Sequence, residues 1–294
     1  MNNAPSMVLW AYMLRPWPYR LLILGILVSP LALLPPRPAQ VELIPPLNAK
    51  RFGMALFGGQ IIALLATILF VSWSFRWKFN PRPELLEVWT AAPWRFYSES
   101  ICSELGLLLS VFVLIQAGAA TWGSIGMHRS DKRMPWLIAL VGACYIILRF
   151  AIKPLTMSAS HWVAVAFVHH STGGDQGADS TQLGLSMVLE AIRQAGPWTC
   201  AMVVLWMGLL APIIEELFYR GLVLKALSGR LPAWMALLGQ AIAFAMMHLE
   251  MSRFIYLLAF GLMLGYLVRR TSSLLPAILL HVSVNVAALV AALS

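Results

Sequence analysis

Long apolar runs separated by short polar loops limit what this chain can fold into. Of its 294 residues, 60% are hydrophobic and 11% are charged, whereas roughly 25% are charged in an ordinary soluble domain. So few charges cannot cover a water-soluble fold, which excludes a soluble enzyme, a nucleic-acid-binding protein and a disordered chain. Because lipid offers no partner for open backbone groups, such runs must be helical. The sequence therefore predicts an all-α, polytopic transmembrane helical bundle.

The apolar runs predict eight or nine transmembrane helices. The clear runs lie at 21–34, 52–73, 101–123, 135–150, 198–219, 231–249, 254–268 and 274–293. Most of them approach the ~20 residues that cross about 30 Å of hydrocarbon. A further run at 155–169 is short, and either spans or lies at the interface. We expect the first run to be an uncleaved helix, because the motif after it lacks a small residue at the position that signal peptidase requires.

The composition changes between the two groups of spans. Residues 171–182 are polar and glycine-rich, as in a loop, and 183–193 show the apolar spacing of an interfacial helix. We therefore expect three parts: an N-terminal transmembrane bundle of unknown role (1–169), a polar loop with an interfacial helix (170–197), and a C-terminal transmembrane core (198–294).

The net charge of +9 comes from 21 Lys and Arg against 12 Asp and Glu. The basic residues cluster in short loops between the apolar runs, so the expected partner is the lipid bilayer with its anionic headgroups, and not nucleic acid. The basic loops at 225–230 and 269–270 place the C-terminus outside, by the positive-inside rule. The chain is therefore expected to be a multi-pass integral membrane protein.

Charged and polar residues interrupt the C-terminal apolar runs at four places. They are 215–220 (EELFYR), Phe244 with His248, Glu250, and His281 with Asn285. A charged side chain at mid-bilayer costs on the order of 2.5–3.5 kcal/mol on insertion scales. Two adjacent glutamates therefore need a partner or a water-filled cavity.

Helical spacing indicates how the glutamates are received. Glu216 and Arg220 are four residues apart and share one face, so they can pair. Glu215 lies ~100° further round the helix and can face a cavity. Pro212 removes a backbone hydrogen bond and should bend or open the helix. The sequence thus predicts an ion pair with a free carboxylate beside it.

Two other helices are expected to complete the cluster. Phe244 and His248, and likewise His281 and Asn285, are four residues apart. Glycines at 261 and 265 on the intervening helix would permit close packing. Taken singly, each pair could be structural, as an ion pair, a packing histidine or a hydrogen bond between helices. Together and in this order they favour a functional site. Glu250, and the group of His169, His170, Asp175 and Asp179, are expected to be solvated.

The three motifs carry a family resemblance. EExxxR at 215–220, FxxxH at 244–248 and HxxxN at 281–285 resemble the CPBP family, also called Abi or CAAX-protease and bacteriocin-processing proteins. This family includes the type II CAAX prenyl endopeptidases. The resemblance covers about 180–294 and is most specific in EELFYRG. It implies an intramembrane glutamic endopeptidase with its catalytic cavity in the C-terminal bundle, in the inner membrane of a bacterium.

Peptide hydrolysis needs an activated water and donors for the developing oxyanion. Glu215 is the candidate general base, because a carboxylate removed from bulk water is a stronger base. The residue chemistry and the resemblance both assign His248 to the same water and His281 with Asn285 to the oxyanion. The supporting residues are expected to be Glu216, Arg220 and Phe244.

The residues leave the metal question open. Glu215, Glu216, His248 and His281 could supply a catalytic zinc, which takes three protein ligands and a water; the set preferred for such a metal is Glu215, His248 and His281. No HExxH motif is present, and the resemblance to glutamate-dependent enzymes favours no cofactor, with zinc as the alternative. The expected substrate is a membrane-embedded or membrane-associated peptide or protein, whether prenylated or not.

Two non-enzymatic functions stay open beside the endopeptidase. Some relatives are described as immunity or scaffold proteins, so a catalytically silent membrane protein is one alternative. Buried carboxylates and histidines also occur in proton-coupled transporters. A transporter should have repeat-related broken helices in both halves, but the front half has no acidic pair matching Glu215 and Glu216.

Overall fold

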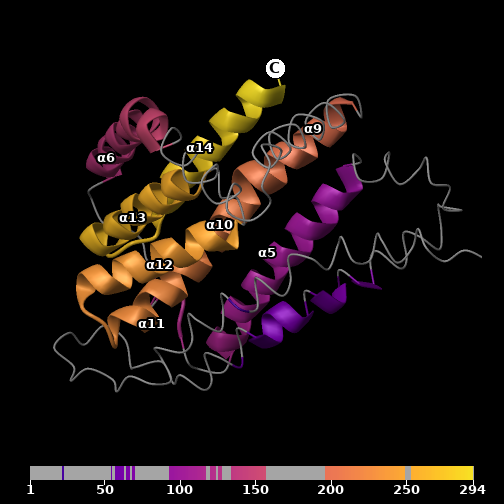
Figure 1. Cartoon of the computed structure of the whole chain (residues 1–294), viewed down its shortest axis with the longest axis horizontal. Coiled ribbons are helices and arrows are strands. Elements are labelled where there is room, and N and C mark those ends of the chain that lie inside the picture. The colour runs from indigo at the N-terminus through magenta and orange to yellow at the C-terminus, as the bar shows by residue number, and fades with distance from the viewer. Residues whose placement is uncertain are drawn as a thin grey trace, which may run out of the picture.

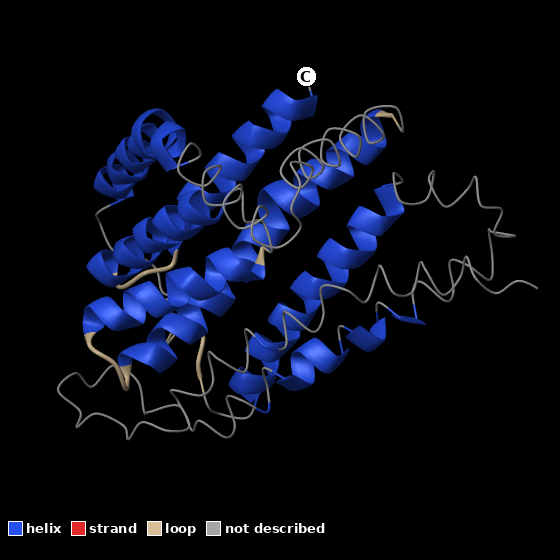
Figure 2. Cartoon of the chain, viewed as in Figure 1, coloured by secondary structure: helices blue, strands red, loops and turns tan. Residues whose placement is uncertain are grey.

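The computed structural model describes most of the C-terminal half of the chain and several segments before it. The described residues are Leu22, part of 54–69, 93–116, 120–123, 125–127, 134–156, 196–248 and 253–293. Within these residues the regular structure is helical and there is no strand, as Figure 2 shows. The all-α prediction is confirmed. The predicted number of spans stays a prediction, because several of the runs lie outside the described residues.

Three of the described helices are long and apolar enough to cross a membrane. They are Ala139–Thr156, Cys200–Ser228 and Phe254–Thr271, and shorter apolar helices include Glu104–Gln116, Ala233–Met247 and Leu275–Ala291. Large apolar side chains are exposed on the outside of the bundle, among them Trp136, Phe150, Leu155 and Trp198. Exposure of an apolar surface of this extent to water would be unfavourable, whereas lipid solvates it. The structure is that of an integral membrane protein.

One continuous rod forms the centre of the bundle (orange in Figure 1). It consists of α9 (Pro197–Val203), the π-helical segment η2 (Val204–Leu210), α10 (Ala211–Glu216), the π-helical segment η3 (Leu217–Val223) and α11 (Leu224–Ser228). The π-helical segment η2 ends just before Pro212, which has no N–H to donate. The predicted span at 198–219 therefore continues to Ser228.

Three further helices pack around this rod, as Figure 1 shows. α12 (Ala233–Met247) contacts α11 and η3, α13 (Phe254–Thr271) lies alongside α12, and α14 (Leu275–Leu293) runs along η2 and α10. They agree with the expected runs at 231–249, 254–268 and 274–293 to within a few residues. Their inner faces meet in a core whose fully buried members include Phe218, Leu222, Phe244 and Leu264.

Segments from the first half of the chain flank this core. α5 (Pro93–Gln116) contacts α10 and η3, while α6 (Met134–Ile147) contacts α14 and continues into the π-helical segment η1 (Leu148–Ile152). α5 begins and ends earlier than the run at 101–123. The loop before α6 is joined to the turn before α14, since the Leu274 N–H donates to the Gly126 carbonyl at 3.1 Å. The three-part division of the chain stays a prediction.

Several predicted features lie outside the described residues. They are the run at 155–169 beyond residue 156, most of the run at 21–34, the interfacial helix at 183–193, and the residues His169, His170, Asp175, Asp179 and Glu250.

Replacing Gly261 by alanine is expected to destabilise the bundle by about 1–3 kcal/mol, the usual cost of overpacking. A methyl group on Gly261 would lie 3.1 Å from both Cα and Cβ of Ala241. Because a backbone atom cannot rotate away, α12 and α13 would have to separate. Thermal unfolding of the purified protein in detergent measures the effect. Gly142→Ala is the matched control, since nothing lies within 4 Å of a methyl group there; equal melting temperatures would contradict the close approach.

Candidate active site

Glu216 and Arg220 form a fully buried ion pair on the central rod. The Nη1 atom of Arg220 donates to Oε1 of Glu216 at 2.7 Å, and both side chains are 0% exposed. This is the pair that the four-residue spacing predicts. Two charges can be held in an apolar bundle only when they are paired and hydrogen-bonded. Each residue therefore depends on the other for its place in the core.

The Arg220 guanidinium also contacts two neighbouring helices. Its Cζ atom lies 4.4 Å from the centroid of the Phe244 ring, in a cation–π arrangement. Its Nη2 atom donates to the backbone carbonyl of Gly261 at 3.4 Å. Arg220 thus joins the rod to both α12 and α13, and its position depends on how these helices pack.

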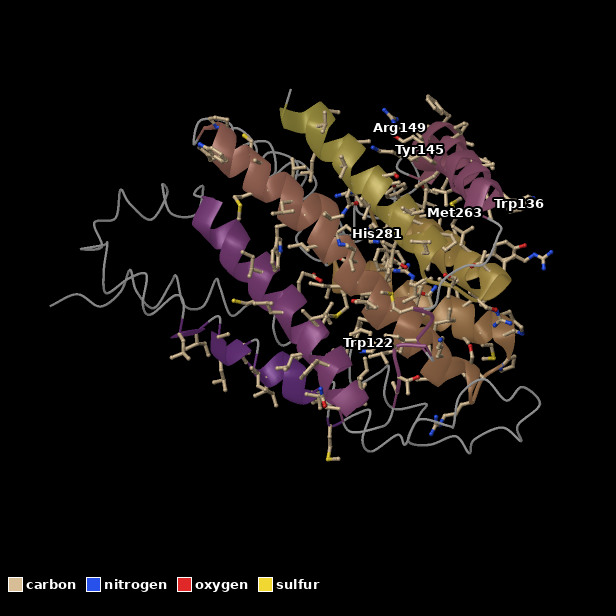
Figure 3. All side chains as sticks on the ribbon, turned by 180° about the vertical axis from the view of Figure 1, so that it is seen from behind. Trp122, Trp136, Tyr145, Arg149, Met263 and His281 are labelled. Atoms are coloured by element: carbon tan, nitrogen blue, oxygen red, sulfur yellow. The ribbon has the colours of Figure 1, made fainter. Side chains whose placement is uncertain are left out.

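His281 connects α14 to the two glutamates. Its Nδ1 lies 2.8 Å from the same Oε1 of Glu216 that binds Arg220. A carboxylate only accepts hydrogen bonds, so Nδ1 carries the proton, and in the neutral ring Nε2 carries the lone pair. Nε2 lies 3.8 Å from Oε2 of Glu215. His281 is 3% exposed, and Figure 3 places it near the centre of the bundle.

Glu215 is the carboxylate that the rod does not use for pairing. Its side chain is 13% exposed, and its Oε2 has no hydrogen-bond partner among the described residues. The ionisable groups that act on it electrostatically are Glu104, His281, Glu216 and Arg220. Glu104 lies on α5, so the first half of the chain contributes a charge to the site. Sequence reasoning missed Glu104, although it is an acid within the apolar run 101–123.

Phe244 lies between the two histidines. Its ring centroid is 4.6 Å from that of His248 and 5.8 Å from that of His281, in edge-on arrangements. The Nδ1 atom of His248 donates to the Phe244 carbonyl at 2.7 Å, which leaves Nε2 as the acceptor in the neutral ring. The structure therefore connects His248 to the Glu215–His281 group through the Phe244 ring.

Asn285 is held by the π-helical segment before Pro212. The Ala211 N–H donates to the Trp206 carbonyl, five residues earlier in the chain. By the same spacing, the donor to the Met207 carbonyl would be the backbone nitrogen of Pro212. Proline has no N–H, and the Met207 carbonyl accepts from Nδ2 of Asn285 at 3.1 Å instead. An amide carries two N–H groups. One therefore binds the rod, and the other remains for a further acceptor.

Gln240 is a second residue that the sequence reasoning missed. Its side chain is fully buried, and Nε2 donates to the Gly261 carbonyl at 2.9 Å. Gln240 precedes Phe244 by four residues, as Phe244 precedes His248. Extending that four-residue spacing by one turn would have found it.

The structure does not bring the residues considered for zinc together as a set of ligands. Among them, no three His, Cys, Asp or Glu side chains come together as the ligands of a metal ion. Glu215, His248 and His281, the set considered for zinc, thus do not form such a group in this conformation. Glu216 and Nδ1 of His281 are engaged with one another, and Glu216 also holds Arg220.

Comparison with known families gives one match. Residues 197–287 match the family model of the type II CAAX prenyl endopeptidase Rce1-like proteins. The matched residues include the rod and the site residues of α12 and α14. No curated protein and no solved structure matches the chain. Residues 197–287 are therefore similar to the Rce1-like type II CAAX prenyl endopeptidases, a family of membrane proteases, as the sequence motifs predict.

Proposed function

We propose that this protein is an intramembrane endopeptidase of the bacterial inner membrane that hydrolyses peptide bonds of a membrane-associated substrate. The observation that carries the proposal is the 3.8 Å separation of Oε2 of Glu215 and Nε2 of His281 inside the bundle. Both atoms are acceptors when His281 is neutral, so one water molecule can donate a proton to each. A carboxylate and an imidazole on the same water are suited to general-base catalysis.

In the proposed reaction Glu215 takes a proton from this water as its oxygen attacks the substrate carbonyl carbon. The proton is shared between Oε2 of Glu215 and Nε2 of His281, so that His281, once protonated, donates to the oxyanion. The second N–H of Asn285 is the other oxyanion donor. When the C–N bond breaks, the leaving amine takes up the proton that the water gave to the Glu215–His281 pair, and the unprotonated Nε2 of His248 accepts this proton and relays it to the amine.

Glu216 and Arg220 are assigned a positioning role in this mechanism. Glu216 accepts from Nδ1 of His281 at 2.8 Å and thereby turns Nε2 toward Glu215. Arg220 holds Glu216 in place through the ion pair at 2.7 Å. Phe244 separates the two imidazoles and excludes bulk water from the Arg220 side of the site.

The proposal is tested by comparing membranes that contain the wild type with membranes that contain Glu215→Gln. Peptide termini in the two samples are compared by mass spectrometry, and quenched fluorescent CAAX peptides with and without a farnesyl group are assayed in parallel. We expect new termini only with the wild type, and the two peptides tell a prenylated from an unprenylated substrate. Identical termini in the two samples, with both proteins folded, would overturn the proposal and favour an immunity or scaffold protein.

The proposed mechanism uses no metal ion. We expect cleavage to persist after treatment with a zinc chelator, and the purified active protein to hold less than stoichiometric zinc. Metal analysis of the same preparation that is assayed provides the measurement. Stoichiometric zinc that is lost together with activity would contradict the prediction.

A further inference from the structure

Gln240 is a buried polar residue that the proposed reaction does not use directly. It lies on α12, is 0% exposed, and donates through Nε2 to the carbonyls of Gly261 at 2.9 Å and Leu237 at 3.1 Å. Its Oε1 has no hydrogen-bond partner among the described residues. A buried amide oxygen without a partner is costly. An apolar side chain would pack here without that cost, so packing alone does not account for glutamine.

The Gly261 carbonyl receives donors from two different elements. Nε2 of Gln240 reaches it from α12 and Nη2 of Arg220 reaches it from η3 at 3.4 Å. A methyl group on Gly265 would lie 2.5 Å from Nε2 of Gln240, so glycine at this position admits the amide.

Hydrogen bonds thus run without a gap from Gln240 to the catalytic histidine. Gln240 binds the Gly261 carbonyl, which binds Nη2 of Arg220, and Nη1 of the same guanidinium binds Glu216. Glu216 in turn binds Nδ1 of His281. A planar guanidinium held at two of its nitrogens has a fixed orientation, and the Gly261 carbonyl is one of the two points that hold it.

We propose that Gln240 is a positioning residue for the active site. By tying the Gly261 carbonyl to α12 it sets the orientation of Arg220, and Arg220 through Glu216 keeps His281 with its proton on Nδ1 and its Nε2 toward Glu215. The link to catalysis rests on the proposed function. The effect of Gln240 on the tautomer of His281 does not rest on the proposed function, and it can be measured without a substrate.

The test compares Gln240→Met with Leu264→Ala in the full-length protein in lipid nanodiscs. Methionine has a similar length and no amide. Leu264 is a fully buried residue of α13, the helix that carries Gly261, and it takes no part in the series of hydrogen bonds from Gln240 to His281. Its replacement therefore loosens the packing of α13 and leaves these hydrogen bonds in place. Side-chain nitrogen signals of 15N-histidine report the tautomer, and the His281 signals are identified by their loss in His281→Gln. We expect the hydrogen-bonded Nδ1–H signature of His281 in the wild type and in Leu264→Ala, and a mixture of tautomers in Gln240→Met.

A kinetic arm uses whichever CAAX peptide the wild type cleaves. Gln240→Met should lower kcat roughly tenfold at unchanged KM, as expected for loss of a residue that supports a reacting group. Combined with Arg220→Lys, it should add little to the effect of Arg220→Lys alone, because both changes act on the same guanidinium site. If the wild type cleaves neither CAAX peptide, a substrate found by the comparison of peptide termini replaces them. If the termini do not differ either, the proposed function fails, while the NMR comparison still decides the role of Gln240.

A wild-type His281 signature in Gln240→Met would overturn the proposal and leave Gln240 as a contact between helices. An equal change of the His281 nitrogen signals in Leu264→Ala would also overturn the proposal, since the change of tautomer would then follow from loosened packing. If Gln240→Met does not fold, Gln240→Asn carries the test. Its amide is one methylene shorter, and it is expected to change the His281 signals in the same direction.

Discussion

Replacing Glu215 by glutamine is expected to lower the rate of peptide cleavage by roughly 10²- to 10⁴-fold, the range for loss of a general base. Glutamine matches glutamate in size but cannot take a proton from water. Among the residues that the structure describes, Glu216 rather than Glu215 holds Arg220. The variant should therefore stay folded. Initial rates on the cleaved peptide, together with thermal unfolding of the same preparation, separate lost catalysis from lost structure.

Glu104→Gln is the matched control for this experiment. Glu104 is the other carboxylate whose charge acts on Glu215 from outside the rod, and glutamine removes that charge without changing the volume. We expect this variant to retain most of the activity, because Glu104 neither holds the water nor transfers a proton in the proposed reaction. Near wild-type rates in Glu215→Gln, or complete loss only in Glu104→Gln, would move the general base to another residue.

Replacing Arg220 by methionine is expected to destabilise the protein by about 3–5 kcal/mol, the cost of leaving a buried charge without its partner. Glu216 is 0% exposed and would lose its cation. The Gly261 carbonyl would lose a donor, and the cation–π contact with Phe244 would disappear. Unfolding in a denaturing detergent series, followed by circular dichroism, gives the change in free energy.

The double variant Arg220→Met with Glu216→Gln distinguishes the charge effect from lost packing. Glutamine at 216 is neutral and can still accept from Nδ1 of His281. We expect the double variant to be more stable than Arg220→Met alone, although it has lost more of the native contacts. If the two are equally unstable, the packing of the arginine side chain and not the buried charge accounts for its effect.

The sequence alone was sufficient for the class of the fold and for the pairs within one helix. Long, uninterrupted apolar runs predict membrane-spanning helices. Among its described residues the structure has three helices that are long and apolar enough to cross a membrane. The Glu216–Arg220 pair follows from the four-residue spacing, since one α-helix places such residues on the same face. Glycines at 261 and 265 lie where α12 and α13 approach closely, as their spacing indicated. These features repeat with the period of the helix, so no tertiary information is needed to find them.

The tertiary structure alone decided how these pairs work together. His281 is 65 residues from Glu216, Asn285 is 78 residues from Met207, and Gln240 is 21 residues from Gly261. Contacts of this kind depend on the rotation and crossing of separate helices, which a helical period does not specify. The sequence therefore identified Glu215 and His281 as candidate catalytic residues. The packing of the helices brings Nε2 of His281 to 3.8 Å from Glu215 and joins Gln240 to the Gly261 carbonyl. The physical reason is that charges inside a bilayer must be satisfied by whatever donors the neighbouring helices bring to them.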